Sequence, residues 1–199
     1  MKDYLKLLRV KHYIKNFLVF VPLFFGGEMP SISKMGTACL GCLAFSAISS
    51  AIYILNDLQD IERDRKHSTK RMRPLASGRI KKEAALVMLG VCICFAVMIS
   101  VLLGSPMSII YLVLYFALNV EYSMGLKNKP IIDVVILASG FVLRIYYGGA
   151  ITGIRISTCL FLVVAVGSLY MGLGKRRNEL MMTKSRDTRA VLQLNILVR

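Results

Sequence analysis

The sequence predicts an all-α integral membrane protein. Three observations support this fold class: 56% of the 199 residues are hydrophobic, only 19% are charged, and the apolar residues gather in long uninterrupted runs. These runs are apolar on every side, whereas the helices of a soluble bundle carry one apolar stripe and one polar face. The composition also excludes a disordered tail, a collagen-like fibre and a small disulfide-stapled domain.

Six segments are candidate transmembrane helices, because a span needs about 20 mostly apolar residues. Residues 35–55 and 84–103 meet this length without a charged residue. The run Phe17–Gly27 is short, so a first span requires a helix that begins upstream, near His12. The expected spans, within one domain over 1–199, are 12–27, 35–55, 84–103, 106–121, 131–151 and 156–174.

The basic residues are distributed asymmetrically. With six alternating spans, all of the 26 Lys and Arg residues fall on one side of the membrane except Lys34, Arg144 and Arg155. Lys and Arg concentrate in cytoplasmic loops. We therefore expect a protein of the cell membrane whose N-terminus and loops 56–83, 122–130 and 175–190 are cytoplasmic. Most of the net charge of +15 then reflects topology, and nucleic acid is not an expected partner.

Acidic residues cluster directly after the second expected span. If the helix continues at about 100° per residue, four oxygen-bearing side chains lie within about 100° of one another. They are Asn56, Asp57, Asp60 and Asp64. Like charges at this spacing repel one another, and a bridging cation removes the repulsion. A small set of hard oxygen ligands suits Mg²⁺, which is often shared with substrate phosphates.

Basic residues follow these carboxylates, as a Mg²⁺–diphosphate site requires. Lys70, Arg71 and Arg73 would neutralise the phosphate oxygens that the metal leaves uncovered. The alternative interpretation is a solvated loop of mixed charge that lies at the lipid headgroups.

The stretch 56–78 reads N-D-x-x-D-x-x-x-D followed by K-R-x-R-P-x-x-x-G. This pattern resembles the first aspartate-rich motif of the UbiA superfamily of intramembrane prenyltransferases. Tyr122 and Lys127 fall after the fourth span, where that family carries a Tyr…Lys motif. After the sixth span, where ordinary members carry a second aspartate-rich motif, residues 175–179 read K-R-R-N-E. This basic form and the opening residues 15–23 resemble one branch, the decaprenyl-phosphate phosphoribosyltransferases.

The resemblance covers about residues 5–190 and implies a nine-helix bundle. Because six spans are visible, we expect the chain to be C-terminally truncated. It also implies an enzyme that moves 5-phosphoribosyl from phosphoribosyl diphosphate to a polyprenyl (decaprenyl-type) phosphate within the bilayer, releases diphosphate and uses Mg²⁺. Asp57, Asp60 and Asp64 would be catalytic and, with Asn56, hold the metal. Phosphate would be bound by Lys15, Lys70, Arg71, Arg73, Tyr122, Lys127, Lys175, Arg176 and Arg177. Secondary candidates are Asn16, His67, Asp133 and Glu179.

Two charged residues lie within the fifth expected span, where a charge costs about 2.5–3.5 kcal/mol and usually faces a cavity or a partner. Asp133 is near the cytoplasmic surface and is a candidate ligand for the metal or the ribose. Arg144 lies about 16 Å further along the helix, too far for a direct pair. We expect Arg144 to be structural.

Two other functions remain open. A UbiA-type prenyltransferase would use a prenyl diphosphate donor and an aromatic or other acceptor, but the missing second aspartate motif speaks against it. A non-catalytic membrane protein would bind anionic lipid through its basic loops, and its activity would survive Asp60→Asn and Asp64→Asn.

Overall fold

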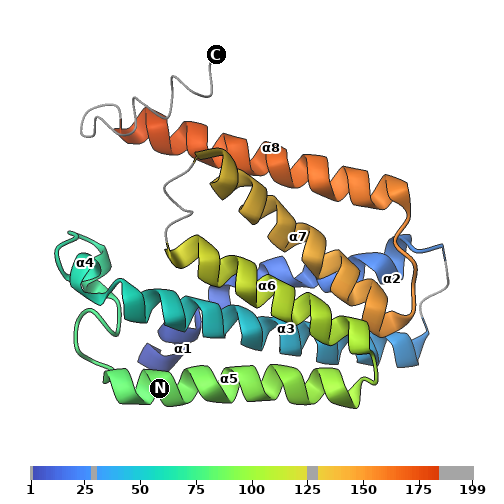
Figure 1. Cartoon of the computed structure of the whole chain (residues 1–199), viewed down its shortest axis with the longest axis horizontal. Helices are drawn as coiled ribbons and strands as arrows, with labels where there is room; N and C mark the ends of the chain where they lie inside the picture. Colours follow the sequence, from blue (N-terminus) through green and yellow to red (C-terminus); the bar gives the residue numbers. More distant parts are fainter. Residues whose placement is uncertain (1, 28–30, 125–129, 184–199) are drawn as a thin grey trace.

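The computed structural model describes residues 2–27, 31–124 and 130–183, and these residues form helices and no β-strand. Figure 1 shows the long helices stacked side by side, from α5 at one edge to α8 at the other. In chain order the elements are α1 (Lys2–Leu8), the 3₁₀-helix η1 (Val10–Phe20), α2 (Val21–Phe25), α3 (Ile32–Gln59), α4 (Ile61–Arg65), the 3₁₀-helix η2 (Lys70–Met72), α5 (Lys82–Leu102), α6 (Pro106–Met124), α7 (Pro130–Thr152) and α8 (Thr158–Thr183).

Four of these helices are long and apolar enough to cross a bilayer: α3, α5, α7 and α8. The chain is therefore a multi-pass membrane protein, as expected. The expected span 106–121 is helical throughout as part of α6, but α6 is not among these four. The segment 12–27 is not among them either. The structure thus supports four of the six expected spans.

The N-terminal segment differs from the single span expected over 12–27. It is divided into α1, η1 and α2. Arg9 adopts left-handed backbone angles (φ 53°, ψ 45°) and so separates α1 from η1. Pro22 lies in the first turn of α2. Because proline has no N–H to donate, it is tolerated at the start of a helix and disfavoured in its interior.

Helix α3 lies at the centre of the fold and packs against α5, η1, α6 and α7. Its Phe45 ring meets the rings of Tyr115 and Tyr147, with centroids 4.6 and 5.3 Å away. In contrast, α5 and α8 expose large apolar side chains such as Val91 and Val166. These exposed apolar faces are suited to contact with lipid.

Gly148 on α7 permits a close contact with η1. A Cβ atom at this position would lie 2.1 Å from the carbonyl oxygen of Val19 and 2.9 Å from its carbonyl carbon. Because both atoms belong to the backbone, Gly148→Ala is expected to push η1 away and lower the free energy of unfolding by about 1–3 kcal/mol. Thermal unfolding in detergent measures this effect. Gly90→Ala on α5, where no atom would lie within 4 Å of the new Cβ, is the control. Equal melting temperatures for the two variants would contradict the contact.

Candidate active site

The residues after α3 retain almost the geometry of a continuing helix. The angular positions given above assume that the helix continues through Asp64, but α3 ends at Gln59 and α4 begins at Ile61. Between them, Asp60 has non-helical angles (φ −94°, ψ 8°). Its N–H still donates to the Asn56 carbonyl at 3.0 Å, and the Asp64 N–H donates to the Asp60 carbonyl at 2.8 Å. Because the interruption is a single residue, the four expected oxygen-bearing side chains line one cavity.

We call this space the mixed-charge cavity; its volume is about 430 Å³. Carboxylates and cations both line it, and they come from helices far apart in the sequence. The carboxylates are Asp57, Asp60 and Asp64, and the cations are Arg9, Arg63, Lys70, Arg73, Lys175 and Arg176. Asn56, Tyr53, Tyr122 and Ser123 complete the lining.

Two of the carboxylates are buried and held by arginines. Asp57 and Asp64 are each 3% exposed. Arg73 bridges them: its Nη1 donates to Asp57 Oδ1 at 3.2 Å and to Asp64 Oδ2 at 2.6 Å. Arg9 Nη2 also donates to Asp57 Oδ1, at 2.5 Å. A buried carboxylate without a partner is strongly destabilising, and here two guanidinium groups compensate the charges.

The connection after α4 folds back and thereby delivers Arg73 to the carboxylates. Arg65 Nε donates to the Ala76 carbonyl at 3.2 Å. Leu75, Ala76 and Ile80 are buried in this connection, which anchors the turn that carries Arg73. The part of the connection around 74–76 is therefore packed, whereas residues 66–72 are exposed, as the alternative interpretation of a solvated loop expects.

The oxygen donors fit Mg²⁺ by their chemistry, since carboxylate and amide oxygens are its preferred protein ligands. Within the described ranges, however, no three His, Cys, Asp or Glu side chains are gathered closely enough to hold a metal ion. In this conformation the two buried carboxylates are instead paired with Arg9 and Arg73.

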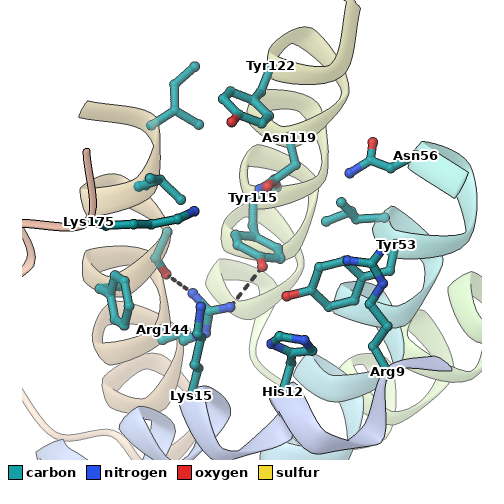
Figure 2. A pocket seen from close by; sticks show the side chains of 15 residues that line it. Arg9, His12, Lys15, Tyr53, Asn56, Tyr115, Asn119, Tyr122, Arg144 and Lys175 are labelled. Atoms are coloured by element: carbon teal, nitrogen blue, oxygen red, sulfur yellow. Dashed lines mark hydrogen bonds between the residues drawn. The ribbon is translucent and has the colours of Figure 1, made fainter. Parts of the chain in front are cut away.

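A second cavity of about 310 Å³ adjoins the first, and we call it the cationic cavity. Figure 2 shows it between η1, α3, α6, α7 and α8. Its basic residues are Arg9, His12, Lys15, Arg144 and Lys175, and no Asp or Glu of the described part of the chain lines it. The two cavities share Arg9, Tyr53, Asn56, Tyr122 and Lys175. The two cavities are therefore neighbours, and among the described residues carboxylates line only the mixed-charge cavity.

Asp133 lies outside both linings, although we expected it near the metal or the ribose. It is fully buried and pairs with Arg176, whose guanidinium donates to Oδ2 through Nε and Nη2. Among the described residues, none donates a hydrogen bond to the other oxygen, Oδ1. Asp133 therefore orients a cation of the mixed-charge cavity.

The other expected site residues separate into three groups. Lys15, Lys70, Arg73, Tyr122, Lys175 and Arg176 line one or both cavities. Four others do not line either cavity: Asn16, His67, Arg71 and Arg177. Asn16 is buried, and the other three are exposed. Lys127 and the side chain of Glu179 lie outside the described residues.

Several lining residues were not predicted. Arg144, expected to be structural, faces the cationic cavity. Tyr115 and Asn119 also line it, and they follow a detectable pattern, because with Tyr122 they recur at the i, i+4, i+7 spacing of one helix face. No sequence pattern identifies Arg9 as a lining residue, because it lies 48 positions from its partner Asp57.

The sequence matches the model of the UbiA prenyltransferase family over residues 17–185. Its curated relatives include the decaprenyl-phosphate phosphoribosyltransferase of Corynebacterium glutamicum, 37% identical over 183 residues, which are 89% of this chain and 54% of the relative. The protein of the same name from Mycolicibacterium smegmatis is 35% identical over 184 residues, with 90% and 58% covered. The chain thus spans little more than half the length of these relatives.

Among solved structures, a UbiA homolog from Archaeoglobus fulgidus bound to DMAPP and Mg²⁺ resembles this chain with a TM-score of 0.78 at 21% identity. The match covers 96% of this chain and 67% of that one. The match therefore shows that the two chains share a fold. The match to the family model covers most of the sequence, and the chain belongs to the UbiA prenyltransferase family.

Proposed function

We propose that the protein transfers 5-phosphoribosyl from phosphoribosyl diphosphate to a polyprenyl phosphate and releases diphosphate. One observation carries the proposal: the end of α8 contributes Lys175 and Arg176 to the cavity that Asp57, Asp60 and Asp64 also line. A prenyl diphosphate brings one charged group to the site. A phosphoribosyl donor and a lipid phosphate together bring three, so further cations suit this reaction.

Mg²⁺ would be held in the mixed-charge cavity by Asn56, Asp57, Asp60 and Asp64. The bound metal would neutralise charge on the diphosphate leaving group. Arg9 and Arg73 pair with the carboxylates in this structure and line the same cavity. They would bind diphosphate oxygens once Mg²⁺ compensates the charge of the carboxylates.

In the reaction, an oxygen of the lipid phosphate forms a bond to C1 of the ribose while the bond from C1 to the diphosphate oxygen breaks. The diphosphate leaves with the electron pair of that bond. Because the acceptor is already an anion, the reaction needs no strong general base. The contribution of the protein is therefore electrostatic: fixed cations stabilise the negative charge that develops on the leaving group.

Transfer is tested with purified protein in detergent, labelled phosphoribosyl diphosphate, polyprenyl phosphate and Mg²⁺. We expect a labelled lipid and free diphosphate. Product formation only with a prenyl diphosphate donor would favour the prenyltransferase alternative. Reaction with neither donor would favour a non-catalytic protein that binds anionic lipid.

We further propose that both cavities open toward the cytoplasm of a cell whose inner or plasma membrane holds the protein, because the basic connections lie at that end. A cysteine-free variant carrying Ser77→Cys is expected to resist a membrane-impermeant maleimide in intact cells and to react after lysis. Ser157→Cys, at the start of α8, is the matched variant for the opposite side of the membrane and should react with the maleimide in intact cells. The reverse labelling pattern would contradict the orientation.

A further inference from the structure

Arg144 carries a buried charge that the reaction scheme above does not use. Its side chain is 5% exposed. Its nitrogens donate to Asn16 Oδ1 at 2.9 Å, to the Gly140 carbonyl at 2.6 Å and to the Tyr115 hydroxyl at 2.8 Å. All three acceptors are neutral, and no carboxylate of the described chain forms an ion pair with this guanidinium.

A guanidinium within a membrane span is costly, and such residues usually face a ligand, a partner or a water-filled cavity. Neutral acceptors fix Arg144 in place, and the rings of Phe45, Tyr115 and Phe141 lie 4.9–5.6 Å from its central carbon. The rings attract the guanidinium, but none of these contacts supplies a negative charge to neutralise it. Since the guanidinium faces the cationic cavity together with Lys15 and Lys175, this cavity is suited to an anion.

The cationic cavity also adjoins an apolar groove of about 390 Å³ between η1, α7 and α8. Lys15 and Phe141 line both spaces, and the Lys15 ammonium lies 5.9 Å from the centre of the Phe141 ring. The rest of the groove lining is Ile14, Leu18, Val163, Val164, Gly167, Ser168 and Met171. Along α8 the groove extends for about 12 Å from Met171 to Val163, starting one turn from Lys175.

We propose that these two spaces form the binding site of the lipid acceptor, with its phosphate in the cationic cavity and the first part of its prenyl chain in the apolar groove. The inference rests on the proposed function and adds the place of its second substrate. Among the described residues, no carboxylate lines the cationic cavity, so the lipid phosphate binds there through Lys15, Arg144 and Lys175 without a metal ion. Because the two cavities share Arg9, Tyr53, Asn56, Tyr122 and Lys175, this phosphate would lie next to the donor in the mixed-charge cavity.

Binding of geranyl phosphate to the protein in detergent, with a chelator in place of Mg²⁺, tests the site directly. We expect geranyl phosphate to bind saturably. Geraniol and ribose 5-phosphate, tested directly or as competitors, should each bind at least tenfold more weakly, because geraniol lacks the phosphate and ribose 5-phosphate lacks the prenyl chain. Equal competition by ribose 5-phosphate would assign the cavity to the donor and overturn the proposal. Equal binding of geraniol would overturn the role of the cations.

Two substitutions test the two halves of the site. Lys15→Gln removes a cation that lines the cationic cavity and not the mixed-charge one. Gly167→Phe fills the groove from a position where a Cβ would meet no atom within 4 Å. Each is expected to weaken geranyl phosphate binding at least tenfold while leaving the affinity for Mg²⁺–diphosphate unchanged. Unchanged binding of geranyl phosphate in either variant would overturn the proposal.

Matched control variants carry the same chemical changes elsewhere. Arg155→Gln removes an exposed cation beyond the end of α7, and Gly90→Phe adds a ring at an open position on α5. Both should bind geranyl phosphate as the unmodified protein does, and loss of binding in them would overturn the assignment. Wild-type protein that binds geranyl phosphate but forms no phosphoribosyl lipid would count against the proposed function alone.

Discussion

Replacing Asp64 by asparagine is expected to lower phosphoribosyl transfer by about 100- to 1,000-fold, the range seen when one electrostatic contact to a transition state is removed. Asparagine preserves the shape of the side chain but not its charge. Asp64 is buried and, with Asp57, forms the acidic wall of the mixed-charge cavity. The rate of labelled lipid formation, measured over a series of Mg²⁺ concentrations, should fall and require more Mg²⁺ for half of its maximum.

Glu62→Gln is the matched control for this prediction. Glu62 lies on α4 like Asp64, but its side chain is 77% exposed and pairs with Arg65 at 3.0 Å. Exposed pairs of this kind contribute at most about 1 kcal/mol, so Glu62→Gln should leave transfer near the wild-type rate. If Asp64→Asn were as active as Glu62→Gln with the same Mg²⁺ dependence, Asp64 would serve only as the structural partner of Arg73.

The acidic motif could be predicted from the sequence because its geometry is local. Asn56, Asp57, Asp60 and Asp64 share a cavity through helical spacing alone, and one non-helical residue does not alter this arrangement. The helices α3, α5, α7 and α8 were also predictable, since each is a long apolar run. The division of the N-terminal segment was not, because its apolar residues gave no sign of the 3₁₀ geometry of η1.

The cationic part of the site could be predicted only in part, because its contacts join distant positions. Arg9 meets Asp57 across 48 positions, and Arg144 meets Asn16 across 128. No spacing rule connects such residues, and only the packing of η1 and α7 against α3 brings them together. Asp133 shows the same limit: its position in the first turn of α7 could be predicted, but its partner Arg176 lies on another helix.

The pair of Asp133 and Arg176 carries the second large expected effect. Arg176→Gln would leave a fully buried carboxylate whose Oδ1 already has no donor among the described residues. Loss of one partner from a buried ion pair costs about 3–5 kcal/mol, so this variant should be strongly destabilised. Asp133→Asn should cost less, about 1–3 kcal/mol, because the side chain of Arg176 is 19% exposed and can reach water. Thermal unfolding of the two variants measures this difference.

The double variant Asp133→Asn with Arg176→Gln separates the structural role of the pair from the functional one. Removing both charges leaves no buried ion without a partner, so the double variant should regain most of the stability that Arg176→Gln loses. Arg176 also lines the mixed-charge cavity, so transfer should remain as low in the double variant as in Arg176→Gln. If activity instead recovered together with the melting temperature, Arg176 would only hold α8 against α7. In that case Lys175 would be the cation of α8 that faces the substrate.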